Sequence, residues 1–131
     1  MDALNNTVQM EHLLNWVEIP VTNMKRAARF YGELLNLQLQ EMKLGPNDYA
    51  LFDIKDKHNT GALVKGEGYK PSANGTVVYL NGGRNLSSIL ERVKKAGGKV
   101  LLEKTFLSKE AGYIGYFSDS EGNKVGVHSM E

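Results

Sequence analysis

The stretch LNWVEIPVTNMKRAARFYGELL, residues 14–35, changes from one periodicity to another within a few residues. Apolar side chains alternate through residues 14–21, which is typical of a β-strand with one buried face. Thr22 and Asn23 follow, and both residue types are suited to capping a helix. The next apolar residues recur at the spacing of one helical face: Met24, Ala27, Ala28, Tyr31, Leu34 and Leu35. The stretch therefore predicts a strand that leads directly into an amphipathic helix.

The second half of the chain repeats this pattern. Residues 76–81 (TVVYLN) are strand-like, residues 82–85 form a turn, and Asn85 is placed to cap a helix. Leu86, Ile89, Leu90 and Val93 then share one helical face, and Gly97-Gly98 supplies the usual helix stop. The identity between the halves is slight, so the repeat rests on pattern alone.

Three short strand-like runs follow each predicted helix. They cover residues 37–43, 49–54 and 61–65 in the first half and 99–105, 113–118 and 124–129 in the second. Between the halves, GEGYKPSANG (residues 66–75) has the composition of a linker. We therefore expect an α+β fold in one domain, residues 1–131. It contains two tandem βαβββ modules, about 12–65 and 76–130, whose curved mixed sheets form a shared cleft.

Composition excludes several classes of function. The 131 residues carry a formal net charge of +1, too small to favour nucleic acid or an anionic membrane surface. The absence of cysteine excludes disulfides, thiolate metal sites and cysteine nucleophiles. No apolar run has the length of a membrane helix, and no phosphate-binding or dinucleotide-binding glycine motif occurs. We expect a cytoplasmic protein with no nucleic-acid or membrane partner.

Strand alternation separates two faces in each predicted sheet. Val17, Ile19 and Val21 are expected under the first helix, as are the alternate residues of the strands at 76–81 and 124–129 under the second. The opposite, helix-free face then collects aromatic and ionisable groups, a mixture typical of a small-molecule cleft. These residues are Trp16, Glu18, Tyr79, Asn81 and His128.

Each cleft candidate has a functional and a structural interpretation. Glu18, if buried, would have a raised pKa and act as an acid or base; the alternative is an ion pair. His128 is the other candidate catalytic group, or else a half-exposed strand-end histidine. Trp16 and Tyr79 are expected as aromatic walls or core residues, with Asn81 beside them as a polar contact.

Three basic residues lie outside this set. Lys104 would bind an anionic group at the cleft rim, or else is simply exposed. Arg26 and Arg29 are expected on the solvated side of the first helix, without a functional role.

Residues 16–39, WVEIPVTNMKRAARFYGELLNLQL, resemble the opening of the vicinal oxygen chelate superfamily. This superfamily contains glyoxalase I, bleomycin-resistance proteins and extradiol dioxygenases. Residues 116–129, YFSDSEGNKVGVHS, resemble its closing motif, and GALVKG and AGGKV fit between them. The resemblance covers about residues 12–130 and implies paired βαβββ modules around a cleft.

The resemblance also implies where metal ligands would lie in catalytic members. The two His positions fall on Trp16 and Val77, and the two Glu positions fall on Leu63 or Val64 and on Gly126. None of these side chains ligates a divalent metal, whereas such enzymes use three or four N and O ligands. We therefore expect no metal and no other cofactor.

Three hypotheses about function follow. The first is a glyoxalase/bleomycin-resistance-like protein that binds or sequesters a small molecule without metal. The second is a glyoxalase-like lyase or isomerase that uses Glu18 or His128 as general base. The third is a regulatory module whose sheet face binds a protein. The resemblance further implies a homodimer, because modules of this fold often complete their cleft across two chains.

Overall fold

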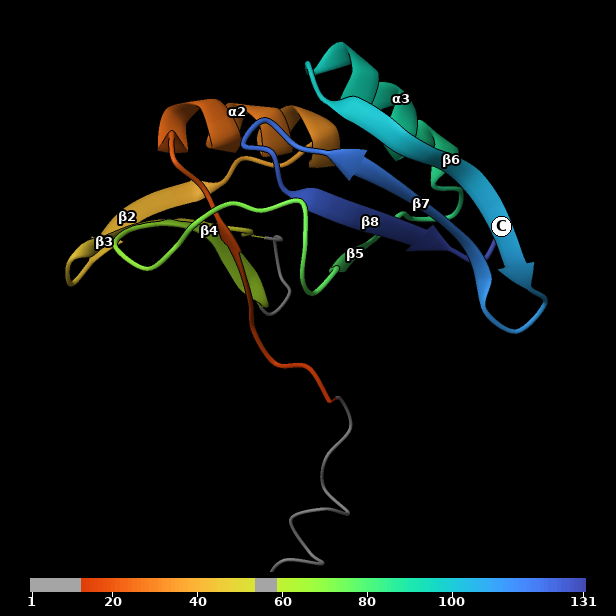
Figure 1. Ribbon diagram of the computed structural model, residues 1–131, viewed down its shortest axis with the longest axis horizontal. Coiled ribbons are helices and arrows are strands. Elements are labelled where there is room, and N and C mark those ends of the chain that lie inside the picture. The colour runs from red at the N-terminus through yellow and green to blue at the C-terminus, as the bar shows by residue number, and fades with distance from the viewer. Residues whose placement is uncertain (1–12, 54–58) are drawn as a thin grey trace, which may run out of the picture.

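The computed structural model describes residues 13–53 and 59–131, which form two four-stranded sheets with one helix each. In the first module, β1 (Val17–Pro20) leads into α2 (Met24–Leu35), followed by β2 (Gln40–Leu44), β3 (Asn47–Leu51) and β4 (Gly61–Lys65). The second module repeats this order with β5 (Tyr79–Asn81), α3 (Ser87–Lys95), β6 (Lys99–Ser108), β7 (Gly112–Ser118) and β8 (Lys124–Ser129). The predicted α+β fold of two βαβββ modules is confirmed (Figure 1).

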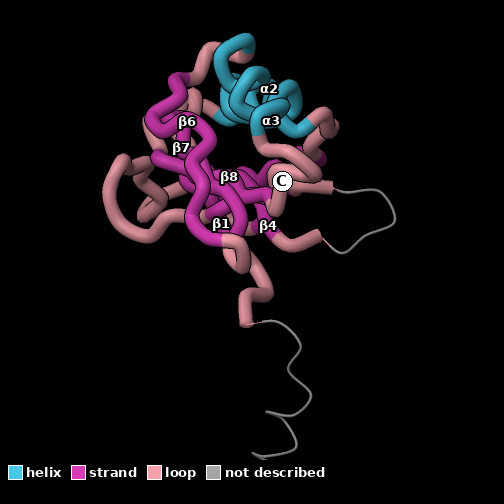
Figure 2. Tube along the Cα trace, turned by 90° about the vertical axis from the view of Figure 1, so that its right-hand side faces the viewer, coloured by secondary structure: helices cyan, strands magenta, loops and turns pink. Residues whose placement is uncertain are grey.

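The two sheets have equivalent topology. Their strand orders are β1-β4-β3-β2 and β5-β8-β7-β6, with the first pair of each order parallel and the others antiparallel. Both helices lie on the same side of the curved sheets, so the opposite faces are left without helices (Figures 1 and 2). We refer to these as the helix faces and the concave faces. The strands β1 and β5 are edge strands in this arrangement.

Alternation along the strands explains which residues form the core. Ile19, Leu63 and Ala50 lie side by side across β1, β4 and β3 and belong to the buried cluster under α2. Val125 and Val127 of β8 and Phe117 of β7 occupy the matching positions of the second module. The predicted helix-facing residues Ile19, Val125 and Val127 are thus buried, as the period of two requires, whereas Val17 and Leu80 are only partly buried.

Local sequence signals also fix the helix ends. Asn23 caps α2 by accepting the backbone N–H of Arg26 at 3.0 Å, and Asn36 ends it in the left-handed conformation with a φ of 55°. At the second helix Asn85 accepts the Ser87 N–H at 3.0 Å, and Gly97, with a φ of 93°, follows its last turn. The cap at Asn23 and the glycine stop after α3 agree with the sequence-based expectation, whereas the cap position of α3 falls on Leu86, which makes no side-chain capping bond.

Strand boundaries differ from the prediction at several points. β1 begins at Val17 rather than at residue 14, because the first strand-strand hydrogen bond is made by the Val17 N–H to Thr60. β5 is only three residues long, whereas β6 extends to Ser108. Residue 54, predicted as a strand end, and residue 12, the expected start of the first module, lie outside the described residues. No helix in the described ranges has the length and apolarity needed to cross a membrane.

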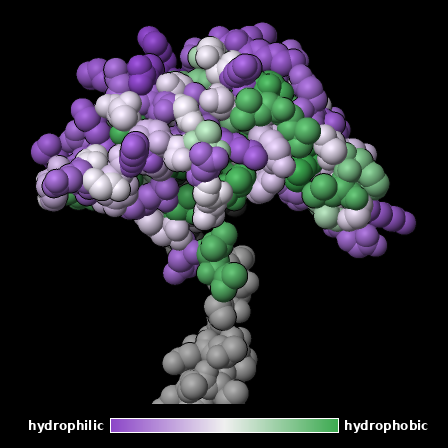
Figure 3. Space-filling view, viewed as in Figure 1, coloured by the Kyte–Doolittle hydropathy of each residue, from purple (hydrophilic) through white to green (hydrophobic). Residues whose placement is uncertain are grey.

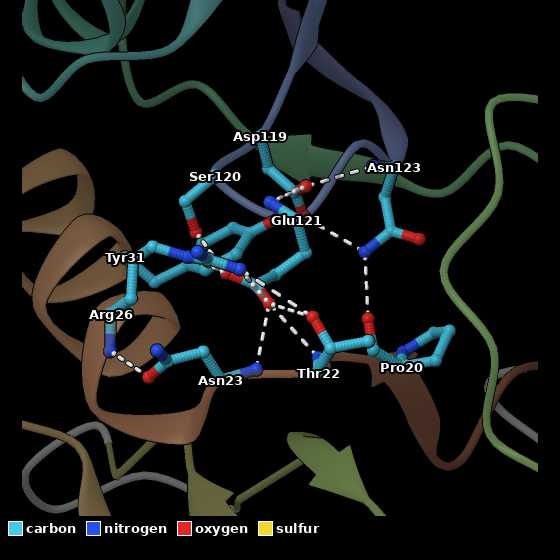
Figure 4. A network of polar contacts seen from close by, with 9 residues as sticks. All are labelled: Pro20, Thr22, Asn23, Arg26, Tyr31, Asp119, Ser120, Glu121 and Asn123. Carbon is cyan, nitrogen blue, oxygen red and sulfur yellow. Dashed lines mark hydrogen bonds and ion pairs between the residues drawn. The ribbon is translucent and has the colours of Figure 1, made fainter.

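The two modules are joined by a carboxylate that crosses between them (Figure 4). Glu121, in the turn between β7 and β8, accepts hydrogen bonds from the backbone N–H groups of Thr22 and Asn23, both at 2.9 Å. The Arg26 guanidinium donates to the same carboxylate at 2.7 Å and 3.0 Å. We call this group, Glu121 with Thr22, Asn23 and Arg26, the clasp. Arg26 is partly exposed as expected, but it also has this structural role.

Electrostatics favour the charged form of Glu121. Burial of its carboxyl group acts to raise the pKa, but hydrogen bonds from Arg26, Asn23 and Thr22 outweigh it and lower the pKa to about 2. The side chain of Glu121 has no exposed surface, whereas that of Arg26 is 47% exposed. The clasp is therefore a buried anion satisfied by fixed donors at the start of α2, where the helix dipole also favours negative charge.

A second set of contacts accompanies the clasp. The Tyr31 hydroxyl of α2 donates to Asp119 at 2.6 Å, and burial of this tyrosine raises its pKa well above the usual value. The Asn123 amide donates to the Pro20 carbonyl at 2.8 Å, and its oxygen accepts the Ser72 N–H at 3.0 Å. Turn, first module and linker thus meet at one end of the interface between the modules.

Candidate functional site

An open groove of about 770 Å³ lies between the edge strands β1 and β5. It brings together residues from the start of the described chain, the β3–β4 region and the second module. Its wall is more apolar than polar, and three aromatic side chains line it. The lining includes the aromatic residues Trp16, Phe52 and Tyr79, the polar residue Asn81, and Leu13 and Leu14 at the mouth.

The Trp16 indole is held in place on the groove wall by two further residues. Its Nε1–H donates to Glu18 Oε2 at 3.1 Å, and the Tyr69 hydroxyl donates to Glu18 Oε1 at 2.8 Å. The hydrogen bond to Glu18 raises the pKa of Tyr69 to about 12. Trp16 itself remains 45% exposed. Each Glu18 oxygen therefore accepts a hydrogen bond from a neighbouring aromatic side chain.

Tyr69 also closes the concave face of the first sheet. Ala62 and Val64 alternate with the core residues of β4, so they point to the concave face, yet both are fully buried. Glu18 pairs with Ala62 and Tyr49 with Val64, and Tyr69 interacts with both Glu18 and Tyr49. The linker side chain thus lies over this part of the sheet.

The concave face of the second sheet has a different lining. Tyr79 of β5 and Tyr116 of β7 both pair with Gly126 of β8, one from each side. Their ring centroids are 6.1 Å apart, and the Lys124 ammonium lies over the Tyr116 ring at 4.2 Å. Tyr79 is 42% exposed. This face therefore presents an open aromatic ring with a positive charge beyond it.

The other predicted cleft residues make local contacts. A ring nitrogen of His128, Nε2, hydrogen-bonds the Ala111 carbonyl in the β6–β7 turn. Asn81 accepts the Gly83 N–H at 2.8 Å, which stabilises the turn after β5. His128 and Asn81 are register partners on neighbouring strands, so the structure brings these two together. Neither has a hydrogen bond to Glu18.

Lys104 belongs to a different surface from Trp16 and Tyr79. Its ammonium donates to Asn85 Oδ1 at 3.1 Å, beside the start of α3, and lies over the Tyr113 ring at 4.4 Å. Tyr113 packs against the core cluster under the helices. Lys104 therefore contacts the helix face of the second sheet, and the structure does not bring it to the groove.

The positions at which the resemblance implies metal ligands do not fit a divalent cation. Trp16, Val77 and Gly126 offer no side-chain lone pair for a metal, and the Trp16 N–H is a donor already used by Glu18. Leu63 lies in the core, and Val64 is fully buried on the other face. Across residues 13–53 and 59–131, no group of three or more His, Cys, Asp or Glu side chains could hold a metal ion.

Four residues of the concave faces and the clasp could not be assigned a contact from the sequence pattern that was used. Tyr69 lies in the linker, where no periodicity indicates a contact with Glu18. Tyr116 and Lys124 alternate on β7 and β8 with core residues, so strand alternation alone could have placed them on the concave face. Glu121 carried only a turn signal.

The comparisons with known proteins agree with this geometry. The sequence model of the Glyoxalase/Bleomycin resistance protein/Dioxygenase superfamily matches residues 13–127. The chain belongs to this superfamily. No curated protein matches the chain in a sequence search.

Solved structures of this superfamily type share the fold at low identity. A glyoxalase I mutant from Zea mays has a TM-score of 0.69 and 15% identity over 90% of this chain and 45% of its own, so this chain spans under half of that protein. A glyoxylase/bleomycin resistance protein/dioxygenase domain from Frankia has a TM-score of 0.68 and 16% identity, and the match covers 92% of this chain and 98% of that domain. An antibiotic-binding protein from Streptomyces has a TM-score of 0.63 and 18% identity, and the match covers 92% of this chain and 97% of that protein.

Proposed function

We propose that this member of the glyoxalase/bleomycin-resistance superfamily binds a planar aromatic small molecule in the groove between β1 and β5, without a metal. The groove itself carries the proposal. It has room for a drug-sized ligand, and Trp16 and Tyr79 line it with close to half of each side chain exposed. Aromatic rings left open in a concave site favour ligands that stack on them.

The comparisons support binding as the class of function. One similar structure is an antibiotic-binding protein. At 18% identity this similarity supports the fold alone. The proposed class of ligand therefore rests on the residues that line the groove. Metal independence rests on the residues at the ligand-equivalent positions, where hydrocarbon, indole and glycine replace nitrogen and oxygen ligands.

The observed contacts do not favour the lyase or isomerase hypothesis. Both Glu18 oxygens accept hydrogen bonds from Trp16 and Tyr69, and Glu18 is half-buried rather than buried. His128 Nε2 bonds the Ala111 carbonyl. A general base must lie beside the substrate proton, and neither Glu18 nor His128 is among the residues that line the groove.

One observation favours an interaction module as the second candidate. Exposed apolar side chains gather where β6 ends and at the chain end beside it, as Figure 3 shows on the right of the molecule. They are Phe106, Leu107 and Met130, each more than half exposed. Apolar patches of this kind mark protein contacts when they are contiguous.

We also propose a homodimer in the cytoplasm. Leu13 and Leu14, 84% and 74% exposed at the groove mouth, are apolar surface that a second chain would bury. Analytical ultracentrifugation of the wild type and of the double variant Leu13→Ser/Leu14→Ser tests the dimer, and a monomeric wild type contradicts it. Fractionation of the source cells tests the location.

Intrinsic fluorescence tests the binding proposal, because Trp16 is the only tryptophan in the chain. We expect planar probes such as anthraquinone-2-sulfonate or proflavine to quench Trp16 saturably, equally in chelator and in added Zn²⁺. Tyr79→Ala should weaken the binding about tenfold, the effect of losing one stacking partner. Phe106→Ala, an exposed aromatic away from the groove, is the control. Absence of saturable quenching by either probe in the wild type contradicts the proposal.

A further inference from the structure

Gly126 is the residue on which the Tyr79 ring depends. A Cβ atom built at Gly126 would lie 2.4 Å from Tyr79 Cδ2, 2.6 Å from Cε2 and 2.9 Å from Cγ. These distances are far below van der Waals contact, and they involve the base of the ring as well as its edge. Any other residue at this position would therefore push the whole ring off strand β8.

The φ of Gly126 does not require glycine. Its backbone is not among the positive-φ positions, so an L-residue would meet no conformational barrier there. Gly126 also sits in regular register between β5 and β7. What glycine supplies is space, and the Tyr79 ring occupies that space.

The residues next to Tyr79 give this surface a charge. The Lys124 ammonium covers the Tyr116 ring at 4.2 Å, so Tyr116 is not an open stacking partner. Tyr79, whose ring is 6.1 Å from that of Tyr116, remains exposed. A ligand stacked on Tyr79 and extending toward Tyr116 would place its far end beside the ammonium. Glu18 does not line the groove; it lines a smaller neighbouring cavity with Lys124, and its carboxylate already accepts two neutral donors.

We propose that Gly126 is a specificity-determining residue: it lets the Tyr79 ring lie on β8, and the platform of Tyr79, Tyr116 and Lys124 selects planar aromatic ligands that carry an anionic group. This inference rests on the proposed function and narrows its ligand class. It also means that the Tyr79 ring in its present place and a metal-ligating side chain at position 126 exclude one another, because the ring occupies the space that the side chain would need.

The test compares four variants by quenching of Trp16, with anthraquinone-2-sulfonate as the planar anion and proflavine as the planar cation. Gly126→Ala displaces Tyr79, and we expect at least a tenfold loss of affinity for the anion. Lys124→Met keeps roughly the length of the side chain. It should lower the affinity for the anionic probe three- to tenfold and leave the affinity for the cationic probe within twofold of the wild type. These expectations follow from losing one stacking partner and one close charge.

Matched controls exist on the opposite face of the same sheet. In Gly115→Ala the new Cβ points toward Leu86 and Leu90 under α3, away from Tyr79. Lys104→Met removes an ammonium that lies over Tyr113 in the same kind of contact. Both should bind the two probes within twofold of the wild type. Tyr79→Leu removes the ring without altering position 126, so it replaces Gly126→Ala if that variant fails to fold.

The outcomes separate the two proposals. If the wild type quenches with neither probe, the binding function itself is wrong. If the wild type binds but Gly126→Ala, or Tyr79→Leu in its place, retains full affinity, the role of position 126 is wrong and the function stands. If Lys124→Met weakens both probes equally, or neither, the anionic selectivity is wrong.

Discussion

The concave faces of the two sheets are built from the same βαβββ pattern, yet one is covered and the other open. On the first sheet, Val64 points to the concave face and is fully buried there, where the Tyr69 side chain crosses the sheet. On the second, Tyr79 is 42% exposed over Gly126. The difference arises from the linker, which follows the first module and supplies Tyr69 to that face. A duplicated fold therefore need not have two equivalent sites, because the segment joining the copies covers only one.

The largest expected effect concerns the clasp, which holds the second module against the start of α2 in the first module. Glu121→Gln should lower the free energy of unfolding by about 3 kcal/mol, because an amide cannot satisfy the donors of Thr22, Asn23 and Arg26 together. Urea denaturation measures this. Glu110→Gln, at an exposed turn position, is the control. A loss below about 0.5 kcal/mol, the level of ordinary surface pairs, would mean that the clasp does not join the modules.

The same carboxylate predicts a dependence on acid. The pKa of Glu121 falls from its ordinary 4.5 to about 2 in the folded protein. Its contribution to stability is therefore fully present above pH 4.5 and is lost as the pH falls toward 2. Stability measured across this window should fall more steeply for the wild type than for Glu121→Gln. Parallel curves would show that another group controls the acid limb.

A pair of truncations tests the covered and open faces directly. Val64→Ala removes fully buried atoms and should cost about 2 kcal/mol. Ile114→Ala, a larger truncation on the open face, should cost only about 1 kcal/mol because Ile114 is partly exposed. Thermal or urea unfolding of both variants gives the comparison. If Ile114→Ala costs as much as Val64→Ala, the second concave face is covered as well.

The smallest effect concerns the contact between the linker and Trp16. In Glu18→Gln the amide is a weaker acceptor, so the pKa of Tyr69 should fall from about 12 toward its usual 10. Ultraviolet titration of the tyrosines at alkaline pH measures this change. Trp16 emission should shift at the same time, since the indole loses its charged acceptor. Lys43→Met, which breaks an exposed pair with Asp48, should alter neither signal.

Much of the fold was predictable because it depends on neighbours in sequence. The helix cap at Asn23, the Gly97 stop after α3 and the burial of Ile19, Val125 and Val127 follow from residue type and periodicity within short windows. The candidate site was predictable in part. Trp16 and Tyr79 do line one groove. Lys104 contacts the helix face, because it alternates in step with Val100 and Phe106, which pair with helix-facing residues of β7.

The sequence by itself determined the two modules, the faces of most of their strands and the superfamily. Only the tertiary structure decided that Tyr69 meets Glu18 across 51 positions and that Glu121 meets Thr22 across 99. It also decided that Tyr79 fills the space left by Gly126. The reason is physical: periodicity reports which face a side chain takes, but contacts between distant segments depend on how the linker and turns cross the sheets.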